Sequence, residues 1–246
     1  DNSVRENYLF NSQINGIEDA DFVLIIGSNP RFEATMLNAR IRKAYLKNKT
    51  NIVSLNDIGD LTYPYKNLNG KTRTIKNIVD NNNEISKDII NSKKPMIILG
   101  ESFLKSKSAE FLFYSLKIFL SKNNKFTDDW NPINILSSDA STVGCLDLDI
   151  VDTKNELIKS LNENKFEIVY LLGQDNFIFN KKNEFIIYQG SHGDKGAQIA
   201  DIILPGAAYT EQSGHFTNLE GKIQKAYKAS YPPGEAKEDW QIINDL

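Results

Sequence analysis

Short apolar runs that end at a glycine recur along the chain and alternate with segments of helical periodicity. The runs 22–26, 95–99 and 168–172 are continuous in apolar residues, and each is followed directly by a glycine. A run of this kind is typical of a strand that is buried on both faces of a parallel sheet. The apolar pattern predicts further strands at 51–55, 133–136, 185–188 and 202–205.

Helical periodicity fills several intervals between these runs. Asn29 can cap a helix and Pro30 is tolerated in its first turn, and apolar residues then recur at helical spacing from Ala34 to Tyr45. Two more helices are predicted, one over 109–120 and one over 157–161, the latter with a start signal at 152–153. Strands that alternate with helices predict an α/β fold, with Rossmann-like parallel sheets flanked by helices.

The last part of the chain departs from this alternation because glycine and proline interrupt it repeatedly. The breaks are Pro205, Gly206, Gly214, Gly221, Pro232, Pro233 and Gly234. We therefore predict one or more Rossmann-like α/β domains over 1–200. The segment 201–246 is predicted to be irregular and to wrap the sheet edge or reach a neighbouring chain. The segment 57–70 is predicted to be a long loop, either a surface excursion or a functional element.

Composition and charge exclude several classes of function. Twenty-nine Lys and Arg against 32 Asp and Glu leave a formal charge of −3, which lacks the basic excess that nucleic-acid binding requires. No apolar run approaches the roughly 20 residues of a spanning helix, so no membrane span is predicted. Cys145 is the single cysteine, and the histidines are His192 and His215. We therefore expect no disulfide framework, no cysteine-ligated iron–sulfur cluster and no metal site within the chain.

Two loops at predicted strand ends are the candidate binding sites. The first comprises Gly27, Ser28, Asn29 and Pro30, and the second includes Gly190, His192, Gly193 and Asp194. The first loop joins a strand to a helix, where free N–H groups can bind phosphate, although neither the G-x-G-x-x-G nor the P-loop pattern occurs. His192 beside Asp194 can act as an acid–base group, but no nucleophile motif accompanies it. Plain turn chemistry also explains both loops, and we favour it over a binding role.

Longer stretches of the sequence are distinctive enough to indicate a family. They are 27–34 with 38–43, 61–63, 188–194, 200–211 and 232–240. These stretches resemble the large iron–sulfur subunit of respiratory complex I, which is the 75 kDa subunit in mitochondria, and the likeness covers essentially the whole chain. The matching part of that subunit is similar to molybdopterin oxidoreductases, so the resemblance implies domains of the molybdopterin-oxidoreductase type.

The resemblance also implies what the two loops do. In the pterin enzymes the corresponding loops lie near the dinucleotide, whereas in the complex I subunit this domain is understood to have lost that cofactor. Both loops are therefore expected to be vestigial, and we expect no cofactor and no catalytic residue in this chain. The family's iron–sulfur clusters belong to an N-terminal region whose cysteines have no counterpart here.

The sequence departs from the family pattern at a few positions. Ser191 stands where a second His is usual, Thr35 where Pro is common, and Lys222 where an Arg commonly follows Glu-Gly. The change at Lys222 weakens a pterin-binding interpretation, because a point charge does not reproduce the rigid fork of Arg. The iron–sulfur region and the family's C-terminal extension are also missing, so we expect either a split gene or a partial chain.

The implied function is a non-catalytic scaffold or assembly role in the peripheral arm of complex I, which passes electrons from NADH to ubiquinone. The implied partners are other peripheral-arm subunits, especially the iron–sulfur portion of the same subunit. The implied location is the matrix side of the mitochondrial inner membrane or, in a bacterium, the cytoplasmic face of the inner membrane. The alternatives are an oxidoreductase module that binds molybdopterin guanine dinucleotide and a small Rossmann-like module that binds another nucleotide.

Overall fold

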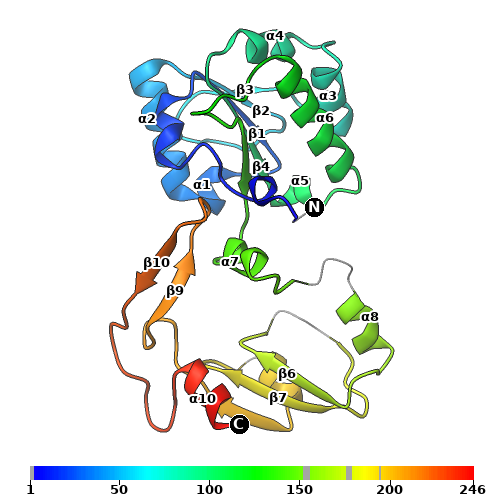
Figure 1. Cartoon of the computed structure of the whole chain (residues 1–246), viewed down its shortest axis with the longest axis vertical. Helices are drawn as coiled ribbons and strands as arrows, with labels where there is room; N and C mark the ends of the chain where they lie inside the picture. The colour runs from blue at the N-terminus through cyan, green and yellow to red at the C-terminus, as the bar shows by residue number, and fades with distance from the viewer. Residues whose placement is uncertain (1–2, 152–155, 176–178, 194) are drawn as a thin grey trace. The chain divides into compact units, whose positions relative to one another are not determined.

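The computed structural model describes residues 3–151, 156–175, 179–193 and 195–246, which form two compact units (Figure 1). Unit 1 comprises Asp1–Leu148 and Thr217–Lys222, and unit 2 comprises Asp149–Phe216 and Ile223–Leu246. The main boundary between the units therefore falls at 148–149, whereas the sequence pattern suggested a division at 200–201.

Unit 1 is built on a five-stranded parallel sheet with the order β3-β2-β1-β4-β5. The strands are β1 (Phe22–Ile26), β2 (Asn51–Ser54), β3 (Lys66–Asn67), β4 (Pro95–Gly100) and β5 (Ile133–Leu136). The strand order reverses between β1 and β4, so the carboxyl ends of these two strands flank the point where open α/β sheets bind ligands. This sheet confirms the predicted α/β fold class.

Helices cover both faces of this sheet, which explains the continuous apolar runs. The helices are η1 (Arg5–Asn7), η2 (Asn15–Asp19), α1 (Pro30–Glu33), α2 (Thr35–Asn48), α3 (Thr72–Val79), α4 (Glu84–Asn91), α5 (Glu101–Leu104), α6 (Ala109–Lys122) and α7 (Thr142–Asp147). Leu24 and Ile97 face a core formed with α3, α4 and α6, and Val23 and Ile98 face a second core formed with η2 and α2 (Figure 1).

Unit 2 contains a second parallel sheet, with the order β6-β7-β8. Its elements are α8 (Glu156–Asn162), β6 (Ile168–Leu172), β7 (Phe185–Gly190), α9 (Lys195–Ile199), β8 (Ile202–Pro205), β9 (Gly214–Thr217), β10 (Ile223–Ala226) and α10 (Asp239–Asp245). The segment 201–246 is thus more regular than predicted, because it holds a sheet strand, a hairpin of β9 and β10, and a helix. The predicted start signal of the helix at 157–161 lies outside the described residues.

Short elements account for most of the other differences from the sequence pattern. Helices α3 and α4 were not predicted, although each is eight residues long and buries isoleucines such as Ile75 and Ile85. The predicted loop 57–70 is interrupted by the two-residue strand β3. Within the described part of the chain, no helix combines the length and the apolarity that a membrane span requires.

Candidate functional site

The first candidate loop lies at the carboxyl end of β1, where it packs directly against the end of β4. Gly27 has φ +71°, and its carbonyl accepts hydrogen bonds from the N–H and the hydroxyl of Ser102, at 3.1 and 3.0 Å. A Cβ atom on Gly27 would lie 2.6 Å from the Cβ of Phe103, and one on Gly100 would lie 2.5 Å from the Gly27 oxygen. Both positions therefore require glycine, and the loop after β1 is in direct contact with the end of β4.

The start of α1 uses its own side chains to satisfy the donors that an anion would bind. The Glu33 carboxylate accepts from the Ser28 hydroxyl at 2.6 Å and from the Asn29 N–H at 3.0 Å. The Asn29 side chain accepts from the Arg31 N–H at 3.1 Å, and Pro30 has no N–H. The N–H groups of residues 32 and 33 donate to the Asn29 carbonyl. The Glu33 carboxylate thus binds donors at the start of α1 that could otherwise bind an anion.

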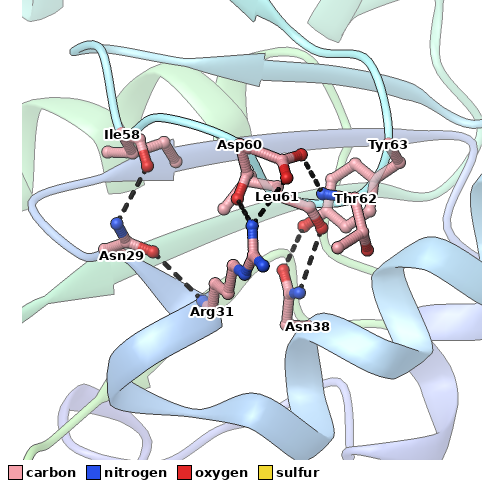
Figure 2. Close-up of polar contacts among 8 residues, drawn as sticks. All are labelled: Asn29, Arg31, Asn38, Ile58, Asp60, Leu61, Thr62 and Tyr63. Carbon is pink, nitrogen blue, oxygen red and sulfur yellow. Dashed lines mark hydrogen bonds and ion pairs between the residues drawn. The ribbon is translucent and has the colours of Figure 1, made fainter.

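The segment that follows β2 is attached to the same loop (Figure 2). The Asn29 side-chain amide donates to the Ile58 carbonyl at 2.9 Å, and Arg31 Nη1 donates to the carbonyl and carboxylate oxygens of Asp60 at 2.6 and 2.7 Å. The Thr62 N–H and then Arg31 hold the pKa of Asp60 below its ordinary value, because both interactions favour the charged carboxylate. The segment is therefore fixed against α1 by charged and neutral hydrogen bonds.

A buried pair of polar side chains continues this attachment to α2. The Asn38 amide donates to the Leu61 carbonyl at 3.1 Å, and its oxygen accepts from the Tyr63 hydroxyl at 2.7 Å (Figure 2). Burial raises the pKa of Tyr63 well above its ordinary value, so the phenol stays protonated and continues to donate. The predicted long loop is thus an ordered part of the unit 1 core at this point.

A hollow of about 330 Å³ remains beside the first loop. Its lining is Gly27, Ser28, Asn29, Glu33, Ser54, Asn56, Asp57, Ile58 and Ser102. The lining contains two carboxylates and no basic side chain. Phosphate groups are recognised by Arg, Lys and free N–H groups, so this lining disfavours the phosphates of a dinucleotide.

The second candidate loop, at the end of β7, also shows structural roles for its glycines. A Cβ atom on Gly190 would lie 2.6 Å from the Tyr188 hydroxyl oxygen, and one on Gly193 would lie 2.8 Å from the Cβ of Ala197. The His192 ring is exposed, and its Nδ1 lies 3.1 Å from the Ser191 hydroxyl oxygen. The backbone carbonyl of His192 accepts a hydrogen bond from the Tyr188 hydroxyl. Asp194 lies outside the described residues, so an acid–base role of His192 beside Asp194 stays a hypothesis.

Two further residues singled out by the sequence are Cys145 and Lys222. Cys145 is exposed in α7, and Lys222 pairs with Glu220 at 2.5 Å. Partial burial works to raise the pKa of Glu220, but Lys222 and the Ile14 N–H outweigh it and lower that pKa. Among the described residues, no group of three or more His, Cys, Asp and Glu side chains is arranged to hold a metal ion.

Two residues that matter at the first loop were missed by sequence reasoning. Glu33 supplies the carboxylate at the start of α1, and Gly100 permits the contact between β1 and β4. Glu33 lies four positions after the capping Asn29, one beyond the spacing of a capping box, so the sequence offered no standard signal for it. The two candidate loops belong to different units, and the structure defines each of them separately.

Comparisons with known proteins agree with the resemblance seen in the sequence. Residues 1–246 match the model of the molybdopterin oxidoreductase family. The chain is 42% identical, over 99% of its length, to the mitochondrial NADH-ubiquinone oxidoreductase 78 kDa subunit of Candida albicans. It is 42% identical over 98% to the 75 kDa subunit of Reclinomonas americana, and 41% identical over 100% to an NADH-quinone oxidoreductase subunit of Rickettsia typhi.

The chain spans about a third of the length of these relatives, since it covers 33%, 35% and 36% of them. The family match covers every residue of the chain, and the parallel sheets flanked by helices agree with it. The chain is therefore a member of the molybdopterin oxidoreductase family.

Proposed function

We propose that the chain forms part of the large subunit of a respiratory NADH:ubiquinone oxidoreductase, where it contributes structure and assembly surface and no catalytic group. Three relatives bear the names of such subunits and match the chain over nearly all of its length. Hydride removal from NADH and electron transfer to ubiquinone are then carried out by other parts of the enzyme.

The observation that carries this proposal is the Glu33 carboxylate at the start of α1. It accepts from Ser28 and Asn29, which are the donors that a phosphate of a pterin dinucleotide would need. A dinucleotide phosphate brought to this loop would meet a like charge and donors that are already satisfied. The residues of this loop therefore do not fit the family's dinucleotide, which supports a structural role for the domain.

The apolar surface of unit 2 supports the assembly part of the proposal. Exposed Ile, Leu, Phe and Tyr side chains lie on the same face of β6, β7 and β8, namely Ile168, Tyr170, Leu172, Phe185 and Ile202. Proteins that work alone rarely expose contiguous apolar patches of this kind. We infer that the partners are other subunits of the peripheral arm, first among them the iron–sulfur portion of the same large subunit.

The proposed location follows from this assembly. In a mitochondrion the chain would lie on the matrix side of the inner membrane, and in a bacterium on the cytoplasmic face of the inner membrane. In both cases the chain would be held by its partner subunits.

The test is a native gel of a mild-detergent membrane extract, probed for this chain and stained for NADH dehydrogenase activity. The proposal expects the chain and the activity in one large band that contains iron and no molybdenum. A chain that migrates alone, away from that activity, would contradict the assembly role. Stoichiometric molybdenum or pterin fluorescence in the band would contradict the absence of the cofactor and support an oxidoreductase module instead.

A further inference from the structure

Strand β6 has the sequence of a central strand but lies at an edge of its sheet. Its residues 168–172 contain no charge, proline or glycine, and within the described part of the chain its only neighbour is β7. Val169 and Leu171 are buried on one face of the sheet. On the other face Ile168, Tyr170 and Leu172 are 62%, 36% and 49% exposed. Natural edge strands are normally protected by charges, prolines or bulges, and β6 has none of these.

The opposite edge of the same sheet is protected, which makes the contrast specific to β6. Strand β8 ends at Pro205, whose missing N–H weakens an edge for further pairing. The outer side of its carboxyl end is also occupied, because the Lys237 N–H donates to the Pro205 carbonyl and the Ala207 N–H donates to the Lys237 carbonyl, at 3.2 and 2.8 Å. The described residues therefore cover the end of one edge of the sheet and leave the β6 edge without a neighbouring strand.

The hydrogen bonds between β6 and β7 identify the groups that point outward. The Phe185 N–H donates to the Glu167 carbonyl at 2.8 Å, and the Gly173 N–H donates to the Gln189 carbonyl at 2.7 Å. Backbone groups alternate in direction along a parallel strand, so odd-numbered residues from 167 to 173 face β7. The N–H and C=O groups of Ile168, Tyr170 and Leu172 consequently point to the open edge.

An apolar groove of about 520 Å³ runs along this edge between β6 and α8. Its lining includes Leu157, Ile158, Leu161, Phe166, Ile168 and Leu172. The groove offers apolar side chains beside a row of backbone donors and acceptors that have no hydrogen-bond partner among the described residues. This combination fits a β-strand with apolar side chains on both faces.

We propose that β6 pairs with a parallel, Ile/Val/Leu-rich β-strand from the portion of the large subunit outside this chain, and that the helix connected to that strand covers the exposed face. The proposal rests on the proposed function. The relatives are about three times as long as this chain, so they contain ample additional sequence. A second copy of the chain fits less well, because two-fold symmetry would pair two β6 strands antiparallel beside an all-parallel sheet.

The first test uses two proline variants that are matched in the direction of the N–H that each removes. Ile168→Pro removes an outward N–H of β6. Ile203→Pro removes an outward N–H of β8, because the Gly206 N–H donates to the Gly190 carbonyl and alternate residues of β8 therefore face away from β7. Both chains are produced in the cells that assemble the enzyme, and the native gel measures the share of each in the large active band. We expect Ile168→Pro to lower that share at least tenfold relative to wild type and Ile203→Pro to lower it less than twofold.

The second test remains informative if Ile168→Pro lowers the abundance of the chain. A photo-activatable phenylalanine analogue replaces Leu172 in the otherwise unchanged chain, and the cross-linked peptide in the active band is identified by mass spectrometry. We expect a peptide of the same large subunit with an Ile/Val/Leu-rich strand sequence. A cross-link to a second copy, to a different subunit or to no peptide would overturn the proposal.

The outcomes separate this proposal from the one on which it rests. If wild-type chain is absent from the active band, the proposed function fails. If wild-type chain and Ile168→Pro are both present at equal levels, the proposed function stands and the pairing of β6 is refuted.

Discussion

The two parallel sheets of this chain differ in how completely the chain covers them. In β1 of unit 1 all five residues are buried, because one core packs on each face of the sheet. In β6 of unit 2, exposed and buried residues alternate, because a single core packs on one face. The two strands nevertheless have equally apolar sequences. The apolar pattern of a strand thus reports the environment that the strand requires in its final assembly, whether or not one chain provides it.

The largest expected difference comes from truncating one isoleucine in each setting. Ile97→Ala empties space in the closed core of unit 1 and should lower its free energy of unfolding by about 2–5 kcal/mol. Ile168→Ala, on the open face of unit 2, should lower that of unit 2 in the isolated chain by less than about 1 kcal/mol. Hydrogen exchange of the β1 and β7 amides measures each unit separately. Equal losses in the two units would break the comparison.

A second pair of variants tests how tightly the carboxyl edge of unit 1 is closed. Gly27 and Gly59 both have φ +71°, but a Cβ atom would collide with Phe103 at Gly27 and would meet nothing within 4 Å at Gly59. Gly59→Ala should therefore cost only the backbone strain of about 1–2 kcal/mol. Gly27→Ala adds overpacking of about 1–3 kcal/mol to that strain. Exchange of the β4 amides checks the difference, and equal effects would show that Gly27 and Phe103 are not packed as closely as described.

Apart from the two-residue strand β3, the strands of both parallel sheets could be predicted from the sequence because their signal is continuous and local. The apolar runs at 22–26, 133–136 and 202–205 coincide with β1, β5 and β8. Helices α3 and α4 were missed because each contributes only a few buried residues within a polar, Asn-rich stretch. The unit boundary at 148–149 was missed because no proline- or glycine-rich linker marks it.

The position of the first candidate loop could be predicted from the sequence, but whether its hydrogen-bond donors are free could not. The glycine-ended run before Gly27 correctly indicated a loop at the carboxyl edge of the sheet. Whether the donors of that loop are free depends on the rotamer of Glu33 and on the segment around Asp60, which lies 27 positions further along the chain than Glu33. Such contacts have no local pattern, so the closed state of the loop became visible only in the folded chain.

A third pair of variants sharpens the contrast within unit 2 itself. Ile186 is fully buried in the single core of unit 2, whereas Ile187 points to the opposite face and is half-buried. Ile186→Val should lower the free energy of unfolding of unit 2 by about 0.5–1.5 kcal/mol, and Ile187→Val should lower it by less. Exchange of the β7 amides in the isolated chain provides the measurement. If Ile187→Val had the larger effect, the face described as open would already be covered in the isolated chain.

The smallest expected effect is the difference between the two units in their response to acid. Both units should lose stability at low pH in the same way, because they differ in the apolar coverage of their sheets. Burial works to raise the pKa of Asp21, but hydrogen bonds from Ser92 and from the N–H groups of residues 93 and 94 outweigh it and lower that pKa. In unit 2 the Ile186 N–H and then Lys181 lower the pKa of Asp201.

Both carboxylates have a lower pKa in the folded chain than in the unfolded chain, where it is about 3.9. Their contribution to stability is therefore fully present above that value and is lost as the pH falls through the lowered folded pKa. Asp21→Asn should flatten the pH dependence of hydrogen exchange between about pH 5 and pH 2 in the amides of β1 alone. Asp201→Asn should have the same effect in the amides of β7 alone. An acid response confined to one unit of the wild-type chain would mean that charge, as well as apolar coverage, distinguishes the two sheets.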